Sequence, residues 1–189
     1  MRVGLVTYLS TNWRGGGGEV KLHRTHQELR QLGVDAELFD MWAPLDRYDL
    51  FHVFGSVAHL SDFVREARAR GKPVVVSSIF YRAGAGAWFY KLESAISARV
   101  RSNLPHAQRR RLFAEATFVC PNTEAEARQI RSFFGVPNER IRVLPSGVDA
   151  RFAQGDPDLF AGRFGVRDYV LYVGRIERRK NPLNLVLAL

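Results

Sequence analysis

The chain has 189 residues, a length that allows one full domain and part of a second. An apolar fraction of 46% and a single cysteine exclude a disordered chain, a collagen-like chain and a small disulfide scaffold. The net charge of +9, carried by 24 arginines and 4 lysines, indicates an anionic partner: nucleic acid, an anionic membrane surface or a phosphorylated small molecule.

The composition also bears on the compartment. No apolar run approaches the roughly 18 residues that a bilayer span needs, and the polar residues from Thr7 onward interrupt the opening segment too early for a signal sequence. The lone Cys120 favours a reducing environment. We therefore expect a cytoplasmic chain.

The chain opens with a strand, a loop and a helix. An apolar run at 2–8 predicts the strand, glycines follow it, and leucines at helical spacing then predict a helix that ends at Gly33. Alternating apolar and polar residues at 34–39 and a run of strand character at 49–55 predict the second and third strands.

The middle of the chain continues this alternation. A helix with an apolar face around Phe63 ends before a continuous apolar run at 73–80, which predicts a strand buried on both faces. Residues 88–100 predict a long helix, and Pro105 separates it from a basic second piece. The next strand is predicted at 117–121.

The following helix begins at a capping box, in which Thr123 is followed three residues later by Glu126. Gly135 ends this helix, and a short strand is predicted at 141–144. Strands that alternate with helices at this spacing need crossover connections. The predicted fold is therefore α/β, with a doubly wound, mostly parallel, Rossmann-like sheet.

The domain organisation changes after this sheet. Residues 1–145 form the Rossmann-like domain, and residues 146–166 have the Gly, Pro and Asp content of a hinge. A fresh apolar strand at 168–174 and a helix with Pro182 at its first position predict that residues 167–189 begin a second Rossmann-like domain. We expect that domain to be cut off at the end of the chain, because a domain needs about 100 residues.

The glycine run before the first helix is a candidate anion site. Gly16, Gly17 and Gly18 expose backbone N–H groups at a helix N-terminus, where a phosphate could lie, although a flexible connector is the alternative. Val20 stands where a dinucleotide G-x-G-x-x-G needs glycine, and the lysine of a P-loop is absent. Asp40, at the end of the second strand, keeps a nicotinamide-binding alternative open.

A second basic cluster, GRIERRKN at 174–181, follows the strand of the new domain. Ligands of open parallel sheets bind beyond the carboxyl ends of the strands. Arg175 and Lys180 would therefore present fixed positive charge to a diphosphate, and a solvated basic loop is the alternative.

Together these motifs resemble family 4 glycosyltransferases, which have the GT-B fold. LPSGVD at 144–149 and YVLYVGRIERRKNPLNLVLAL at 169–189 resemble the segment that joins the two domains of that family. The glycine loop before the first helix and the N-T-E-A-E helix start at 122–126 occur in the same order. The resemblance implies an amino-terminal acceptor-side domain and the start of a nucleotide-sugar-binding domain.

The resemblance also implies an activity: transfer of a sugar from a nucleotide-diphosphate donor to an acceptor, with retained anomeric configuration and with no metal or other cofactor. Arg175 and Lys180 would hold the donor diphosphate, and the Gly16–Gly18 loop would line the cleft. The family's paired glutamates would lie beyond the last residue, so the chain alone is expected to be inactive.

The sequence motifs identify the residues of the acceptor side less clearly than those of the donor side. Many relatives carry a histidine just after the fourth strand, where this chain has Ser77 and Ser78, so the catalytic group is not identified. Ser78, Tyr81 and His59 are the candidates on this side. The histidines lack metal-ligand spacing, and no metal site is predicted. His26 is expected to pack or to bond the sheet edge.

The expected partners are a nucleotide-sugar donor and a sugar or lipid-linked acceptor. The basic stretch Arg99–Arg111 is read first as a solvated helix face and second as a peripheral contact with the inner face of an anionic membrane. Nucleic acid comes last, because no reader motif accompanies the charge. The alternatives to a glycosyltransferase are a nicotinamide-dependent or other two-domain α/β enzyme, and a non-catalytic Rossmann-like binding module.

Overall fold

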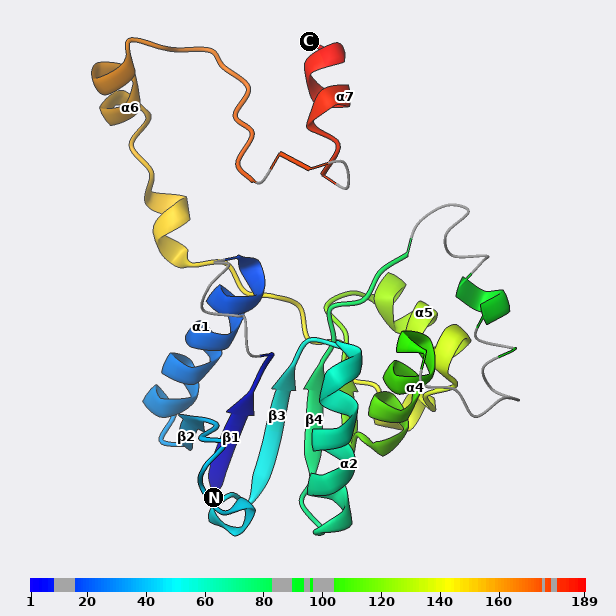
Figure 1. Ribbon diagram of the computed structural model, residues 1–189. Coiled ribbons are helices and arrows are strands. Elements are labelled where there is room, and N and C mark those ends of the chain that lie inside the picture. The colour runs from blue at the N-terminus through cyan, green and yellow to red at the C-terminus, as the bar shows by residue number, and fades with distance from the viewer. Residues whose placement is uncertain (9–15, 83–89, 94–95, 97–103, 175, 178–179) are drawn as a thin grey trace. The chain divides into compact units, whose positions relative to one another are not determined.

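The computed structural model describes residues 1–8, 16–82, 90–93, 96, 104–174, 176–177 and 180–189 (Figure 1). These residues form two compact units, Met1–Ser146 and Gly147–Leu189. Within the described ranges, every helix falls short of the length and hydropathy that a bilayer crossing requires.

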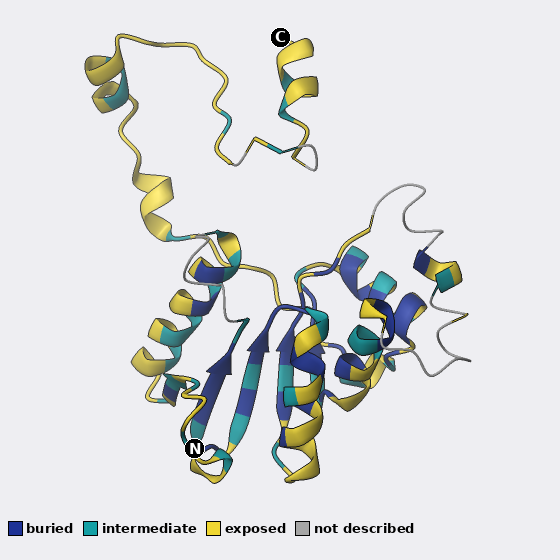
Figure 2. Ribbon diagram, viewed as in Figure 1, coloured by how far each residue is buried: buried dark blue, intermediate teal, exposed yellow. Residues whose placement is uncertain are grey.

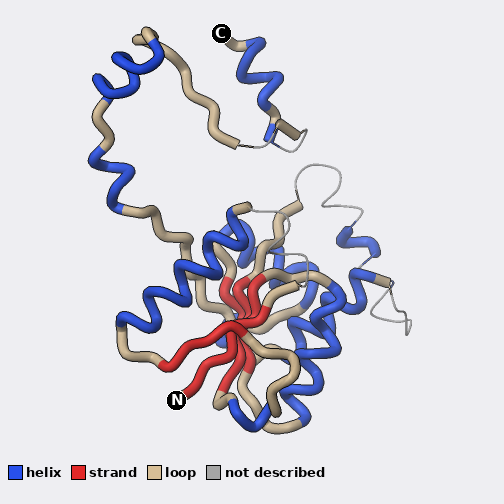
Figure 3. Tube along the Cα trace, turned by 60° about the vertical axis from the view of Figure 1, so that its left-hand side comes forward, coloured by secondary structure: helices blue, strands red, loops and turns tan. Residues whose placement is uncertain are grey.

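A five-stranded sheet forms the centre of the first unit (Figures 1 and 3). Its strands are β1 (Arg2–Val6), β2 (Asp35–Leu38), β3 (Leu50–Phe54), β4 (Val74–Ser77) and β5 (Phe118–Cys120). They lie in the order β2-β1-β3-β4-β5, and every neighbouring pair is parallel. The predicted α/β fold with a parallel sheet is therefore confirmed.

Helices connect these strands. They are α1 (Gly17–Gln31), α2 (Ser61–Ala69), α4 (Pro105–Glu115) and α5 (Glu124–Phe134), with 3-10 turns η2 (Leu45–Arg47), η3 (Ala58–Leu60) and η4 (Asn138–Arg140). The helix predicted at 88–100 falls largely outside the described residues, and its described part at 90–93 is helical.

The helix ends follow the signals in the sequence. Gly33, just beyond α1, and Gly135, just beyond α5, have positive φ of 79° and 70°, a conformation that glycine adopts without strain. At the start of α5, the Thr123 hydroxyl accepts a hydrogen bond from the backbone N–H of Glu126 at 3.1 Å. The predicted cap is therefore present.

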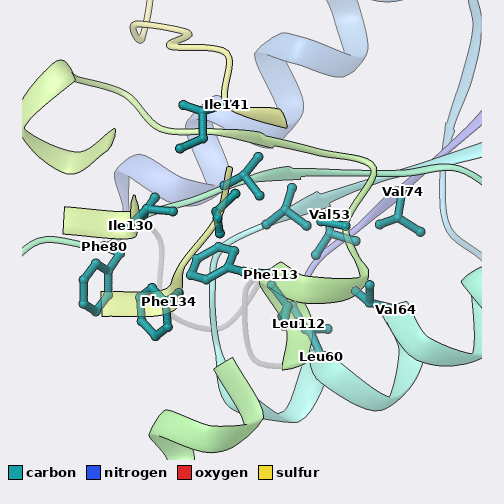
Figure 4. Close-up of a cluster of buried hydrophobic side chains, with 14 of the residues drawn as sticks. Val53, Leu60, Val64, Val74, Phe80, Leu112, Phe113, Ile130, Phe134 and Ile141 are labelled. Atoms are coloured by element: carbon teal, nitrogen blue, oxygen red, sulfur yellow. The ribbon is translucent and has the colours of Figure 1, made fainter. Parts of the chain in front are cut away.

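Two buried clusters flank the sheet. On β3, Val53 belongs to the larger cluster and Phe54 to the smaller, as expected because successive side chains of a strand point to opposite faces. The smaller cluster contains Leu22 of α1, and the larger joins β3, β4 and β5 to α2, α4 and α5 (Figure 4). Because both faces are covered, the strands are mostly buried (Figure 2).

A glycine in β1 permits close packing of aromatic rings. Tyr48 and Phe51 are fully buried, with ring centroids 5.2 Å apart. A Cβ atom added at Gly4 would lie 2.8 Å from Phe51 and 2.9 Å from Tyr48. Any larger residue at position 4 must therefore displace one of these rings.

The strand predicted at 141–144 does not form as a strand. This segment makes one parallel bridge, between Val119 and Ile141. The backbone N–H of Arg142 also donates to the Val119 carbonyl at 3.0 Å, and the N–H of Leu144 donates to the Pro121 carbonyl at 2.8 Å. Because β5 has only three residues, it offers few backbone groups for a sixth strand to pair with.

The second unit contains the 3-10 turn η5 (Ala150–Gln154) and the helices α6 (Pro157–Phe164) and α7 (Pro182–Leu187). Helix α7 begins at Pro182 as predicted, but the strand predicted at 168–174 is not present. The described part of this unit has no buried residue (Figure 2), and Val173 is 83% exposed. An apolar run becomes a strand only when another strand pairs with it, and none does so in these residues.

Candidate functional site

The carboxyl ends of the five strands meet at one edge of the sheet, because all of them are parallel. We call this the carboxyl edge. The loop after β4 begins there with Ser78, and the loop after β5 brings Asn122. Ligands of open parallel sheets bind at such an edge, so the polar side chains here form the candidate site.

Three glycines mark the start of α1 at this edge: Gly16 precedes the helix, and Gly17 and Gly18 are its first residues. Gly16 is extended, and its carbonyl accepts the first described hydrogen bond of α1, from the N–H of Val20 at 3.2 Å. A Cβ atom added at Gly17 would meet nothing within 4 Å, and one at Gly18 would make only an ordinary contact with Ile79. Packing among the described residues therefore does not require glycine at either position.

A buried glutamate fixes the first turn of α1 to the end of β1. Glu19 is 8% exposed, and its carboxylate accepts a hydrogen bond from the Tyr8 hydroxyl at 3.1 Å. An acidic side chain in the first turn of a helix is also favoured by the helix dipole. The start of α1 is thus held by a side-chain contact that the sequence did not predict.

A second buried glutamate joins two loops of the carboxyl edge. Oε1 of Glu126 accepts hydrogen bonds from the Ser78 hydroxyl at 2.7 Å and from the N–H of Phe80 at 2.8 Å. Oε2 accepts from the N–H of Asn122 at 2.9 Å and from its side-chain amide at 3.3 Å. The glutamate of the capping box therefore reaches Asn122 rather than the N–H of the cap itself.

This arrangement places Ser78, one of the predicted acceptor-side residues. Ser78 is fully buried, and its hydroxyl donates to Glu126. Its contact therefore orders the two loops of the carboxyl edge. Tyr81 is 64% exposed and His59 is exposed, and no hydrogen bond between described residues joins either of them to Glu126 or Asn122.

Lysine 21 of α1 reaches the loop after β5. Its ammonium donates to Oδ1 of Asn122 at 2.5 Å, and the Ser146 hydroxyl donates to the same oxygen at 3.2 Å. Burial lowers the pKa of Lys21, while the nearby Glu126 carboxylate acts in the opposite direction. Sequence reasoning missed Lys21 and Ser146, and the only available signal was the place of Asn122 directly after a strand.

A histidine of β3 contacts a serine of the neighbouring strand β4. The His52 Nε2 and Ser77 Oγ atoms are 2.9 Å apart, and the imidazole stacks on Phe54 with ring centroids 4.3 Å apart. Burial, with a smaller contribution from the Lys21 charge, lowers the pKa of His52 to about 4. His52 is therefore neutral at neutral pH.

The predicted donor residues fall in the second unit. Lys180 is exposed, and its backbone N–H donates to the Glu177 carbonyl at 2.9 Å. Arg175 lies outside the described residues. Their assignment to a donor diphosphate stays a prediction.

The basic stretch Arg99–Arg111 is described from residue 104 onward. Arg109 donates to the Ser56 carbonyl at 2.5 Å and to the Tyr90 hydroxyl at 2.6 Å. Arg110 donates to the Phe133 carbonyl at 3.2 Å. Both guanidinium groups thus hold α4 against its neighbours, and membrane contact through this stretch stays a prediction.

The expected contact of His26 with the sheet edge is confirmed. Nε2 of His26 lies 3.1 Å from the carbonyl of Ala36 in the outer strand β2. Cys120 is buried at the end of β5, and burial raises the pKa of its thiol. Among the described residues, no group of three or more His, Cys, Asp or Glu side chains is placed to hold a metal ion.

Comparison with known proteins gives a family match and several relatives. Residues 18–147 match the family model described as a glycosyl transferase 4-like domain. A D-inositol 3-phosphate glycosyltransferase of Nocardiopsis dassonvillei is 36% identical over 81 residues, which are 41% of this chain and 19% of that protein. The enzyme of the same name from Geodermatophilus obscurus is 41% identical over 73 residues, which are 36% of this chain and 16% of that protein.

A longer alignment is found with D-inositol 3-phosphate glycosyltransferase 1 of Catenulispora acidiphila, at 30% identity over 129 residues, which are 65% of this chain and 29% of that protein. In each of these three alignments the chain spans less than a third of its relative. Among solved structures, a glycosyltransferase from Rickettsia africae ESF-5 aligns with a TM-score of 0.44 and 11% identity, over 89% of this chain and 50% of that one.

Proposed function

The chain belongs to the glycosyl transferase 4-like family, and on this basis we propose that it carries the acceptor side of a glycosyltransferase that uses a nucleotide-diphosphate sugar and retains the anomeric configuration. The observation that carries the proposal is the extent of the family match. Residues 18–147 include α1 from Gly18 onward, both loops joined by Glu126, and Ser146. The match does not favour a nicotinamide-dependent enzyme or a non-catalytic binding module.

The glycine loop is proposed to line the donor cleft. The lack of any packing need for glycine at 17 supports this role, because a backbone without side chains lets a ligand approach closely. The first N–H groups of α1 then face the diphosphate.

Arg175 and Lys180 are proposed to bind the donor diphosphate and to stabilise the charge on the leaving nucleotide. Fixed cations of this kind take the place that a divalent metal has in other transferases, so we propose that the reaction needs no metal.

The acceptor is proposed to be a sugar, a lipid-linked sugar or a phosphorylated polyol. The relatives' name, D-inositol 3-phosphate glycosyltransferase, makes a phosphorylated polyol the first acceptor to test. Tyr81 and His59 are proposed to contact the acceptor from exposed positions, while Ser78 fixes the loop that carries Tyr81.

Release of nucleoside diphosphate from UDP- and GDP-sugars tests the proposal, with and without D-myo-inositol 3-phosphate as acceptor. The assay uses the 189-residue chain and, where its reading frame continues, the longer product. In an active form, Arg175→Ala and Lys180→Ala should each reduce turnover by at least about tenfold. Lys72→Ala removes the same charge next to Asp46, before β4, and should leave turnover unchanged. Unchanged rates in both donor-side variants would remove the assignment.

A further inference from the structure

We propose that Lys21 and Ser146, organised by Asn122, bind a phosphoryl group of a substrate at the carboxyl edge. This inference rests on the proposed function and gives a role to three residues to which the family resemblance assigned none. It assigns the phosphoryl group first to the acceptor, because Arg175 and Lys180 are already proposed for the donor.

Three separate segments bring these side chains together. Lys21 comes from α1, Asn122 from the loop after β5, and Ser146 from the end of the first unit. The Lys21 ammonium and the Ser146 hydroxyl both donate to one atom, Oδ1 of Asn122, at 2.5 and 3.2 Å. Two donors from distant parts of the chain therefore lie beside the same oxygen.

The orientation of the Asn122 carboxamide is fixed from its other side. Its Nδ2 donates to the Ser78 carbonyl at 3.0 Å and to the Glu126 carboxylate at 3.3 Å. The oxygen must therefore face Lys21 and Ser146. Such a fixed acceptor holds both donors in place before a ligand arrives, which reduces the entropy lost on binding.

The charge of Lys21 is incompletely balanced. No carboxylate of the described chain lies within ion-pair distance of its ammonium, and the nearby Glu126 already accepts from Ser78, Phe80 and Asn122. An ammonium has three N–H donors, and the described residues account for one of them. The pKa of Lys21 is lowered mainly by burial, and the charge of Glu126 opposes this shift only in part.

A phosphoryl group matches this arrangement. It carries negative charge and several acceptor oxygens, so it can accept from the free N–H groups of the ammonium. It can also accept from the Ser146 hydroxyl once that single O–H turns from Asn122 to the ligand. Lysine binds phosphate as a compact point charge. His52, the other titratable base near Lys21, has a pKa of about 4 and adds no competing charge at neutral pH.

Calorimetric titration of the 189-residue chain tests this site with D-myo-inositol 3-phosphate, unphosphorylated myo-inositol, UDP and GDP. Lys21→Gln should weaken binding of inositol 3-phosphate at least about tenfold, and Ser146→Ala about threefold. Lys72→Gln is the matched control, because it removes the same charge beside Asp46 and should bind as the unaltered chain does. Myo-inositol should bind equally weakly to every variant.

The nucleotide titrations identify the source of the phosphoryl group. If Lys21→Gln loses binding of inositol 3-phosphate only, the site binds the acceptor. If it loses binding of UDP and GDP only, the same phosphoryl site binds the donor. No binding of any phosphorylated probe to the unaltered chain, or equal binding by Lys21→Gln, overturns the proposal. Lys21→Arg keeps the charge and should restore binding, which separates loss of the ligand contact from loss of the fold.

The result is independent of the transfer assay. Phosphate binding that depends on Lys21, in a protein that transfers no sugar, would overturn the proposed function and leave the site standing. Transfer to a phosphorylated acceptor with an unchanged KM in Lys21→Gln would overturn the site and leave the function standing.

Discussion

A single buried carboxylate, Glu126, orders the carboxyl edge. It is 4% exposed, and all four donors around it come from the loops after β4 and β5. A buried carboxylate is tolerated only when such charge-assisted hydrogen bonds replace its water. Glu126 therefore joins the loops that carry Ser78 and Asn122, in addition to the direct hydrogen bond from Asn122 Nδ2 to the Ser78 carbonyl.

Replacing Glu126 by glutamine tests this role. The variant Glu126→Gln turns one oxygen into an NH2 group that faces hydrogen-bond donors, and it should lower the free energy of unfolding by about 2–3 kcal/mol. Urea denaturation measures the loss. Glu124→Gln alters an exposed residue of the same helical turn and should change stability by less than about 0.5 kcal/mol. Equal effects of the two variants would contradict a special role for Glu126.

The close approach at Gly4 gives a second prediction. Gly4→Ala places a methyl group 2.8 Å from the buried ring of Phe51, so the ring or the strand must move. We expect the free energy of unfolding to fall by about 1–3 kcal/mol, measured by thermal or urea denaturation. Gly17→Ala, where the new Cβ meets nothing, is the control and should not destabilise the chain. An unchanged free energy of unfolding in Gly4→Ala would mean that the rings of Tyr48 and Phe51 can shift without cost.

Two histidines, His106, which is buried, and His52, which is half-buried, give the stability a dependence on pH. Burial lowers the pKa of both His52 and His106 to about 4, with help from Lys21 and from Arg110 and Arg109 respectively. The unfolded chain, with pKa values near 6.5, binds more protons below that pH. Stability should therefore be full above about pH 6.5 and should fall as the pH approaches 4.

Unfolding free energies measured between pH 7 and pH 4.5 check this prediction. His106 stacks on Phe134, with ring centroids 5.1 Å apart, so His106→Phe keeps a ring in place and removes the titrating group. The variant should reduce the pH-dependent loss by up to about 3 kcal/mol. The same slope as the unaltered chain would show that the pKa of His106 does not differ between the folded and unfolded states.

At the scale of elements, the sequence predicted helix ends correctly, because a helix end is determined by interactions between residues close together in the chain. Helix α5 has its hydroxyl cap at Thr123 and a left-handed glycine at 135, and both were readable because each signal lies within one turn of the helix end. Strands depend on partners elsewhere in the chain. The apolar runs at 141–144 and 168–174 gave the right tendency but the wrong element, since neither has a partner strand with enough free backbone groups.

The features of the candidate site also fall into those that the local sequence predicts and those that depend on distant residues. The glycine loop could be placed at the start of α1, because a glycine run between a predicted strand and a predicted helix is a local pattern. The contact between Lys21 and Asn122 joins residues 101 positions apart, and no spacing in the sequence marks it. The buried state of Ser78 was equally hidden, because it depends on where Glu126 of a later helix lies.

At the scale of the whole molecule, the apolar core belongs to the first unit. Every buried residue of the described chain lies between Val3 and Ile141, and the described residues after Gly147 include none. Cooperative unfolding depends on burial of apolar surface. The burial that supports cooperative unfolding of the described chain therefore lies within the first unit.

A shortened chain that ends at Ser146 tests whether the first unit is stable without the second. It should unfold cooperatively, with the same midpoint temperature as residues 1–189, because no buried residue is removed. Circular dichroism during heating measures the transition. A fall in the midpoint by more than about 5 °C would show that the second unit stabilises the sheet.

The two outer strands of the sheet have a further consequence, for association between molecules. An uncovered outer strand is a template on which another chain can add a strand. β2 is only four residues long, and its acidic side chains Asp35 and Glu37 form ion pairs with Arg2 and Arg47, both at 2.8 Å. On the opposite side, the segment that bridges at Ile141 already occupies backbone groups of β5. Neither side of the sheet is therefore a long, bare edge, and edge-to-edge aggregation of the folded first unit is disfavoured.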